Sequence, residues 1–226
     1  MPNLVKVVFD IPINDSFDYI CDDKKVKIGS RVRVSLGNTV RIGIIISVIA
    51  SDSKPKTYKI KKIDALIDES PILTKEMLKT CKWASSYYHH PIGQVIFSAI
   101  TPLHRKQRKE STGKIEIQHN ESFEELILNA EQKKIYNSLI KDRKKFKVNV
   151  IRGITGSGKT ELYVKLAKKS IEEYSQTIIM VPEINLIPQT LERFKKYSKI
   201  VPLQYHSNLT PIQKHKVWKA CCLEEQ

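Results

Sequence analysis

The sequence predicts an α/β protein of two domains, a small β-rich N-terminal domain and a parallel α/β lobe. Three observations predict it. Short apolar runs separated by turn residues fill residues 1 to about 70, and apolar runs of strand and helix length alternate after residue 123. The stretch IRGITGSGKTELY, residues 151–163, has the G-x-x-x-x-G-K-[ST] spacing of a phosphate-binding loop. We therefore expect one domain at residues 1–102 and the lobe at residues 123–226.

Five short runs rich in Val, Ile, Tyr and Phe make up the first part of the chain. Asn, Asp, Gly, Ser and Pro stand between them, and these residues are typical of turns. Several short strands at this spacing indicate a small barrel or sandwich. In chain order the runs are LVKVVFDI, SFDYI, SRVRVSLG, RIGIIISVI and YKIKKIDALI.

A helix over residues 75–88 is expected to follow these strands. Thr74 can cap its first turn, and Pro91 ends it because proline has no N–H to donate. The apolar side chains that can share one helical face are Leu78, Cys81, Ala84 and Tyr88. Adjacent His89 and His90 cannot point the same way and have no third ligand close in sequence, so we expect packing beside Pro91 rather than metal binding.

The segment LHRKQRKESTGKIEIQHNES, residues 103–122, is polar and charged, which indicates a linker. Beyond it strand and helix patterns alternate, and this order is typical of a parallel sheet covered by helices on both faces. The expected strands are Val148–Ile151, Thr177–Val181 and Ile200–Gln204. The expected helices are Ala130–Lys144, Thr160–Glu173, Asn185–Tyr197 and Thr210–Cys222.

The phosphate-binding loop lies between the first expected strand and a helix, which is the context that such a loop requires. Its glycines allow backbone N–H groups to turn toward phosphate oxygens. Lys159 is expected to meet the β- and γ-phosphates of ATP, and Thr160 to hold Mg²⁺ through its hydroxyl. The expected ATP-binding residues of the loop are Gly153, Ile154, Thr155, Gly156, Ser157, Gly158, Lys159 and Thr160. The alternative is a glycine-rich turn that binds nothing.

Composition narrows the classes of function. The net charge of +15 favours a nucleic-acid partner, because clustered Lys and Arg displace counterions from phosphates, although a general excess of lysine would give the same charge. No apolar run has membrane-spanning length and charges interrupt the start of the chain, so a soluble, cytoplasmic protein without membrane contact is expected. Four cysteines without C-x-x-C pairing predict neither a zinc site nor disulfides: Cys21, Cys81, Cys221 and Cys222.

Five strings, in this order, carry a resemblance. They are FDY (17–19), GSRVRVSLG (29–37), YYHHPIG (87–93), LNAEQKKIY (128–136) and IIMVPEINLIPQT (178–190). Together they closely resemble the N-terminal part of the PriA family (primosomal protein N′), bacterial replication-restart DNA helicases. The phosphate-binding loop alone is common to many nucleotidases, whereas the ordered set is much more specific.

The resemblance implies that residues 1–102 form the family's domain for binding the 3′ end of a DNA strand. The positions that match the family's contacts to the terminal nucleotide are Phe17, Asp18, Gly37 and Lys61. A ring can stack on a base, a carboxylate can accept a hydrogen bond from a 3′-hydroxyl, a glycine lets backbone approach closely, and a lysine can contact a phosphate. From the residues alone, Phe17 is more often a core aromatic and Asp18 a turn residue.

From residue 125 on, the resemblance is to the first RecA-like lobe of a superfamily-two helicase. It implies ATP with Mg²⁺ as cofactor, adenine recognition by Gln132, and contacts to single-stranded DNA from Pro182-Glu183 and Pro188-Gln189. By sequence pattern alone, the last two pairs belong equally to a plain strand-to-helix loop. The partners implied are forked or 3′-ended DNA, other primosome proteins and single-strand-binding protein.

The sequence departs from the family in two ways. Only residues 103–122 stand where relatives carry a winged-helix domain. The chain ends at Gln226, before the Walker-B carboxylates, the arginine finger and the second lobe with its zinc-binding cysteines. We therefore expect a truncated lobe, no complete catalytic set and no zinc ligands in this chain, which is then a fragment, a split-gene product or a remnant.

The expected function is binding of DNA 3′ ends and of ATP in replication restart and primosome assembly. The family is an ATP-dependent 3′–5′ helicase, but this chain alone is expected neither to hydrolyse ATP nor to unwind DNA. The alternative is a non-catalytic DNA-binding module with a vestigial phosphate loop. A small P-loop kinase is disfavoured, because its loop would normally begin the catalytic domain without a β-rich domain in front.

Overall fold

The computed structural model describes residues 2–50, 60–68, 70–106, 122–141, 145–154 and 156–222. The chain divides into two compact units. The first unit comprises Met1–Gly113 together with Thr210–Cys222, and the second comprises Lys114–Leu209 together with Leu223–Gln226. Residues 210–222, which the sequence analysis placed in the lobe, are thus grouped with the first unit.

The first unit contains a five-stranded antiparallel sheet whose strand order is β2-β1-β4-β3-β5. Each strand overlaps one of the five apolar runs of the sequence, so the short-strand prediction is confirmed. The strands are β1 (Asn3–Val8), β2 (Phe17–Cys21), β3 (Arg31–Leu36), β4 (Thr39–Ala50) and β5 (Ala65–Leu66).

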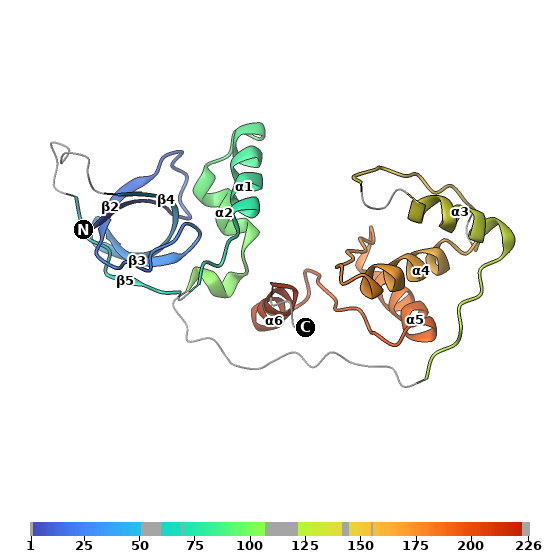
Figure 1. Ribbon diagram of the computed structural model, residues 1–226. Coiled ribbons are helices and arrows are strands. Elements are labelled where there is room, and N and C mark those ends of the chain that lie inside the picture. The colour runs from blue at the N-terminus through green and yellow to red at the C-terminus, as the bar shows by residue number, and fades with distance from the viewer. Residues whose placement is uncertain are drawn as a thin grey trace. The chain divides into compact units, whose positions relative to one another are not determined.

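The sheet curls until its two edges meet, as Figure 1 shows. Ile20 of β2 forms a parallel bridge with Lys62, just before β5. The Ile20 N–H donates to the Lys61 carbonyl and the Ile63 N–H donates to the Ile20 carbonyl, both at 2.9 Å. Closure gives the edge strands partners and encloses an apolar core. That core consists of Val5, Val7, Phe9, Tyr19, Cys21, Val26, Val32, Val34 and Ile45.

Two helices cover the outer face of this sheet, α1 (Lys75–Tyr87) and α2 (Ile92–Ala99). Outward-facing Val8 and Ile44 pack against them in a second core. The Cα of Gly93 lies so close to the Phe9 carbonyl that a side chain at this position would overlap it. Helix and strand therefore meet backbone to backbone, which only glycine allows.

The helix expected at residues 75–88 is present with its predicted cap, since the Met77 N–H donates to Thr74 Oγ1 at 3.2 Å. Leu78 and Cys81 of the predicted face are buried, whereas Tyr88 follows the helix as its C-cap and is 67% exposed. His89 takes the left-handed conformation (φ 50°) that reverses the chain. The helix thus ends before Pro91, and Pro91 serves as the N-cap of α2, which the sequence analysis missed.

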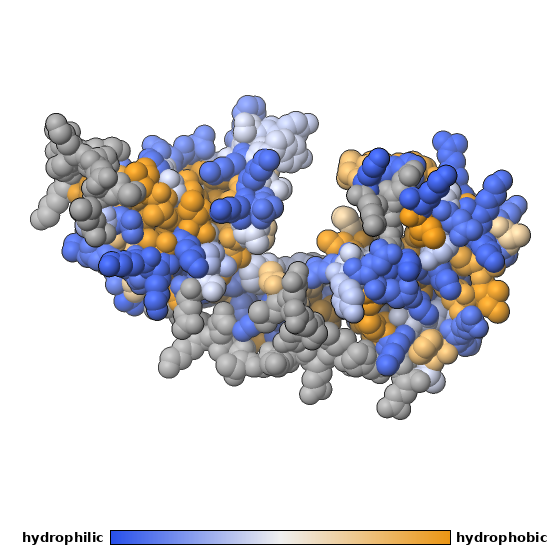
Figure 2. Space-filling model, viewed as in Figure 1, coloured by the Kyte–Doolittle hydropathy of each residue, from blue (hydrophilic) through white to orange (hydrophobic). Residues whose placement is uncertain are grey.

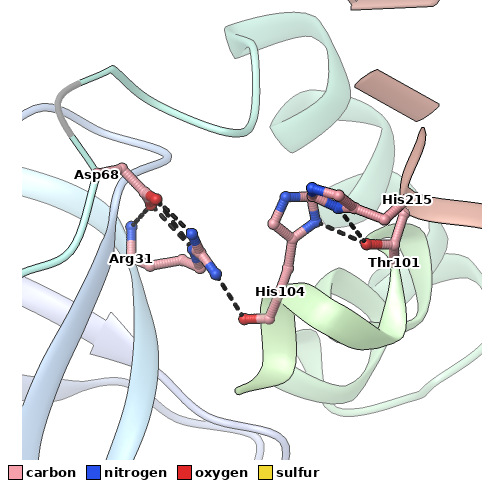
Figure 3. A network of polar contacts seen from close by, with 5 residues as sticks. All are labelled: Arg31, Asp68, Thr101, His104 and His215. Atoms are coloured by element: carbon pink, nitrogen blue, oxygen red, sulfur yellow. Dashed lines mark hydrogen bonds and ion pairs between the residues drawn. The ribbon is translucent and has the colours of Figure 1, made fainter. Parts of the chain in front are cut away.

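A buried polar network joins the sheet to the last helix, α6 (Pro211–Cys222), within the first unit (Figure 3). Arg31 Nε lies 3.0 Å from Asp68 Oδ2, and Arg31 Nη1 donates to the His104 carbonyl at 3.2 Å. Thr101 Oγ1 lies 3.0 Å from His104 Nδ1 and 3.1 Å from His215 Nδ1. Buried polar groups are favourable only when paired, so this network fixes α6 against the short helix η1 (Pro102–Arg105).

The second unit has helices at the expected places. They are α3 (Ala130–Lys141), α4 (Lys159–Glu172), the short η2 (Ile184–Leu186) and α5 (Ile187–Tyr197). An ion pair of 2.9 Å between Arg193 and Glu161 joins α5 to α4. The small core consists of Leu126, Val164, Ala167 and Phe194.

The described residues of this unit do not form the predicted parallel sheet. The described parts of Val148–Ile151, Thr177–Val181 and Ile200–Gln204 contain no β-strand, with a single bridge residue at Ile200. Many of their apolar side chains are exposed. Figure 2 shows orange, hydrophobic atoms on the surface of this unit. Strands of a parallel sheet are stable when both faces are covered and both edges are paired, and these segments lack such neighbours. The most exposed are Val148 (77%), Val150 (79%), Ile178 (87%) and Met180 (90%).

In the described part of the chain, no helix is long and apolar enough to cross a membrane. The four cysteines are free thiols, and Cys21 and Cys81 are buried. Burial raises the pKa of both of these thiols, which keeps them protonated and unreactive.

Candidate functional sites

The four residues expected to contact a DNA end lie at one end of the curled sheet. We call this end the barrel mouth and define it by Phe17, Asp18, Gly37 and Lys61. Phe17 and Asp18 begin β2, and the Lys61 segment runs parallel beside that strand. Lys61 Nζ donates to the Gly37 carbonyl at 3.2 Å. The register of the strands thus gathers residues that are far apart in sequence.

Phe17 is half-buried at the rim of the core. Its ring centroid lies 5.4 Å from that of Phe9, with an angle of 62° between the ring planes. Side chains alternate along a strand, so Phe17 and Tyr19 face inward while Asp18 faces outward. Phe17 is therefore a core aromatic with one part of its ring accessible. Packing in the core and stacking on a base are both compatible with this position.

Asp18 pairs with Lys6 across the two strands. Its Oδ1 lies 3.4 Å from Lys6 Nζ, and only 6% of the Asp18 side chain is exposed. Opposite charges at this cross-strand position attract, and they fix the orientation of the carboxylate. A hydroxyl that binds Asp18 must therefore approach beside the lysine.

Gly37 occupies the turn between β3 and β4 with φ at +60°. Such a turn favours glycine, because a left-handed conformation strains other residues. A side chain at this position would meet nothing within 4 Å. In this structure the glycine is thus needed for the turn, and its backbone is open to a ligand.

The phosphate-binding loop connects to the start of α4, as its spacing predicts. Gly156 and Gly158 both have φ at +80°, and Gly158 is the N-cap of the helix. Thr160 lies half-buried in the first helical turn, and Thr155 lies outside the described residues. Unsatisfied N–H groups at a helix start favour an anion, so the loop has the local geometry of a phosphate site.

Lys159 folds back over its own loop. Its Nζ donates to the Gly153 carbonyl at 2.7 Å and to the Ile154 carbonyl at 2.8 Å, and it lies 3.5 Å from Ser157 Oγ. The ammonium group thus binds the carbonyl oxygens that precede the turn. A phosphate entering the loop would offer charged oxygens in place of these neutral ones, and charged acceptors bind an ammonium more strongly.

Gln132 contacts this loop from α3. Its Nε2 lies 3.4 Å from the carbonyl oxygens of both Ser157 and Gly158. Its position is fixed by a capping box with Asn129, because the Asn129 N–H donates to Gln132 Oε1 and the Gln132 N–H donates to Asn129 Oδ1, each at 2.9 Å. The structure therefore brings together two motifs that lie apart in the sequence.

The remaining candidate residues of the second unit lie at the surface. Glu183 precedes η2 and Pro188 is in the first turn of α5. Pro182, Glu183, Pro188 and Gln189 are outside the small core. Their arrangement is a plain loop into a helix, which leaves both interpretations of these residues open.

An exposed aromatic cluster at the end of α1 was missed by the sequence analysis. The rings of Trp83 and Tyr87 stack with centroids 5.2 Å apart, and Tyr88 packs edge-on at 4.9 Å from Tyr87. All three side chains are more than half exposed, at 57%, 64% and 67%. Their spacing of four and five residues was the available signal. Aromatic side chains gathered at a surface are typical of a binding site for another molecule.

Two family models match the chain. The PriA 3′ DNA-binding domain matches residues 6–101, and the model described as "Type III restriction enzyme, res subunit" matches residues 125–219. These ranges correspond to the curled sheet with its helices and to the segment that contains the phosphate-binding loop. Fold and sites therefore define a DNA-binding domain joined to part of a helicase-like lobe.

Curated relatives match nearly the whole chain. Replication restart protein PriA of Haemophilus influenzae is 27% identical over 95% of this chain and 40% of its own length. The PriA proteins of Rickettsia prowazekii and Borreliella burgdorferi are 30% and 31% identical, over 92% and 94% of this chain and over 31% and 32% of their own lengths. The chain thus spans about a third of the length of these relatives. It belongs to the PriA family of replication restart proteins.

Proposed function

We propose that the first unit binds the 3′ end of a DNA strand at the barrel mouth, as the DNA-recognition step of replication restart in the cytoplasm. The match of residues 6–101 to a 3′ DNA-binding domain supports DNA as the partner. The assignment of the terminal nucleotide to Phe17, Asp18, Gly37 and Lys61 is our proposal.

The convergence of these four residues at one end of the sheet carries the proposal. The Lys61–Gly37 hydrogen bond holds an ammonium group beside an open glycine turn. Phe17 keeps part of its ring accessible at the core side of β2, and the largely buried Asp18 carboxylate is oriented by Lys6 on the other side of the same strand. Stacking, hydroxyl recognition and phosphate contact are the interactions that an unpaired terminal nucleotide needs.

The test compares two ends of the same DNA. The full chain should bind a duplex with a free 3′-hydroxyl more tightly than one with a 3′-phosphate, because a phosphate at that place is repelled by Asp18. In a fluorescence-anisotropy titration at fixed salt, Asp18→Ala should lose this discrimination. The matched control is Asp15→Ala, an exposed carboxylate in the loop before β2. Equal affinities for the two ends in the unaltered protein would refute the proposal.

For the second unit we propose binding of ATP with Mg²⁺, in which Lys159 leaves its carbonyl partners for the phosphates and Thr160 holds the ion. Gln132 is proposed to contact adenine. The glycine conformations, the helix start and the proximity of Gln132 to the loop support this. Lys159→Ala should abolish binding of a fluorescent ATP analogue, whereas Lys165→Ala on the same helix should leave it intact.

We further propose that this chain alone turns ATP over negligibly and does not unwind DNA. Phosphoryl transfer depends on precise positioning. The residues that lead into the loop are exposed and form no strand, so the loop lacks a rigid support on that side. DNA-stimulated phosphate release from the purified chain, lost in Lys159→Ala, would contradict this. Failure to bind the analogue at all would favour the alternative, a DNA-binding module with a vestigial phosphate loop.

The proposed partners are forked or 3′-ended DNA, other primosome proteins and single-strand-binding protein. Among the described surfaces, the cluster of Trp83, Tyr87 and Tyr88 is suited to a protein partner, because clustered aromatic side chains bury large apolar area on binding. A pull-down with the primosome proteins, compared between the unaltered chain and Trp83→Ala, tests this surface.

A further inference from the structure

A polar cleft lies beside the loop that leads into the barrel mouth. It is formed where Asn14, in the segment that joins β1 to β2, faces the second half of α1. Its volume of about 430 Å³ is that of a small-ligand site and can admit a sugar-phosphate unit. The residues that line it are Asn14, Lys82, Ser85, Ser86, His89 and Ile92.

The lining has the composition of a phosphate-contacting surface. Lys, Ser and Asn side chains are among the groups that most often contact nucleic-acid backbones, and none of the described residues that line the cleft is a carboxylate. Lys82 makes no ion pair with any residue that the structure describes. Its ammonium group is therefore available to an anion without first leaving a protein partner.

The cleft walls are held in place by the turn at the end of α1. Ser85 Oγ donates to the His90 carbonyl at 2.6 Å, and the His90 N–H donates to the Ser85 carbonyl at 3.0 Å. These bonds fix His89 in its left-handed conformation at the cleft. The end of a helix by itself disfavours an anion. At the end of α1, however, the Ala84 carbonyl is already bonded to the Tyr88 N–H. The positive charge of Lys82 offsets the negative end of the helix dipole.

The position of the cleft relates it to the proposed DNA-end site. Asn14 precedes Phe17 by three residues, so its backbone lies within about 10 Å of the barrel mouth. A strand whose last nucleotide occupies the mouth has its neighbouring nucleotides within reach of the cleft. A backbone phosphate is thus the anion that this surface would meet first.

We propose that this cleft binds the backbone of the DNA strand next to its 3′ end, with Lys82 on a phosphate and Ser86 and Asn14 as neutral donors. The proposal rests on the DNA-end function above and adds a second subsite to it. The cleft contributes affinity that depends on strand length and salt, whereas the barrel mouth discriminates the chemistry of the end.

The experiment uses the full chain and a fluorescent single-stranded oligothymidylate with a free 3′-hydroxyl, titrated at about 50 and 200 mM salt. Each phosphate contact on a single strand contributes about 0.7 to the slope of log affinity against log salt. The affinity advantage of the unaltered chain over Lys82→Gln should therefore shrink about 2.6-fold between the two salts. Lys24→Gln makes the same charge change at the opposite end of the sheet and should keep the original slope.

The 3′-phosphate oligonucleotide, run in parallel, separates this proposal from the first. Lys82→Gln should retain the preference for the 3′-hydroxyl, because Asp18 is untouched. If the unaltered chain discriminates between the ends but Lys82→Gln has the same salt slope as Lys24→Gln, the cleft proposal alone is refuted. If the unaltered chain binds the two 3′ ends equally well, the DNA-end assignment is refuted, and with it the basis of the cleft proposal.

Discussion

The strands of the first unit and the apolar segments of the second unit have similar sequences but different surroundings. Val32 and Val34 on β3 are fully buried between paired neighbours, whereas Val148 and Val150 are 77% and 79% exposed and belong to no strand. Runs of β-branched apolar residues such as these favour extended structure. This preference therefore produces a sheet only where the same stretch of chain also supplies the partner strands.

The difference bears on the two proposed binding sites. The barrel mouth is built on a closed sheet, and rigid elements hold site residues more accurately than loops do. The phosphate-binding loop has a firm helix on one side and an unpaired segment on the other. We therefore expect the DNA-end site to be formed before its ligand arrives, and the nucleotide site to become ordered as its ligand binds.

Hydrogen exchange should show the largest contrast between the units. Residues 31–49, which form the β3–β4 hairpin, should exchange more than about a thousandfold more slowly than residues 177–205, because paired core strands open only with the whole domain. Mass spectrometry of peptides from the purified chain measures this. Uniform strong protection of both segments would show that the second unit is stable without a sheet.

Core truncation should reproduce the contrast in free energy. Phe97 is 1% exposed, so Phe97→Ala should cost about 3–5 kcal/mol of unfolding free energy. Met180 is 90% exposed, so Met180→Ala should change the unfolding free energy by less than about 0.5 kcal/mol.

Both tryptophans, Trp83 and Trp218, lie in the first unit, so their fluorescence during denaturation reports on that unit. A scan by circular dichroism covers the second. Similar losses for both variants would contradict the comparison.

The sequence predicted the local elements better than their assembly. Turn residues and apolar runs located the five strands, and caps located α1, because these signals act within a few residues. Pairing in the second unit depends on distant segments, so a strand pattern at Val148–Ile151 could not establish a sheet. The docking of α6 was likewise missed, because nothing local indicates that His215 will meet Thr101.

The candidate sites, like the fold, were predicted where the signal is local and missed where it depends on distant segments. The spacing of the phosphate-binding loop correctly predicted the left-handed conformations of Gly156 and Gly158 and the helix that follows, whereas Gly153 does not take such a conformation. The four residues of the barrel mouth came from the family resemblance, and their common position depends on strand register, which no single motif encodes. The cleft at Lys82 was not foreseen, since its walls come from two segments about 70 residues apart in the chain.

A smaller effect is expected at the helix that returns to the first unit. His215 is 5% exposed and bonded to Thr101, so His215→Ala leaves a buried hydroxyl without one partner and should cost about 1–3 kcal/mol. Ile212 on the same helix is 48% exposed, and Ile212→Ala should cost less than about 0.5 kcal/mol. Tryptophan fluorescence during denaturation again provides the measurement. If His215→Ala were as mild as the control, α6 would not be part of the folded first unit.

The smallest expected effect is a dependence on alkaline pH that belongs to the first unit. Burial, with a further contribution from the charge of Asp64, raises the pKa of Tyr19 above its ordinary value of 10.0. The unfolded chain therefore releases this proton first as pH rises, so the stabilisation is complete below pH 10 and is lost as pH climbs toward the folded pKa. The buried thiols of Cys21 and Cys81 act in the same direction, because burial raises their pKa values too.

The contribution of Tyr19 is measured as the difference in unfolding free energy between the unaltered chain and Tyr19→Phe, in denaturant titrations at neutral pH and above pH 10. At neutral pH the variant loses only the 3.3 Å bond from Tyr19 Oη to the Ser35 carbonyl, worth about 1 kcal/mol or less. Above pH 10 this gap should narrow, because phenylalanine cannot ionise. A gap that stays constant would mean that Tyr19 is less buried in solution than the closed sheet requires.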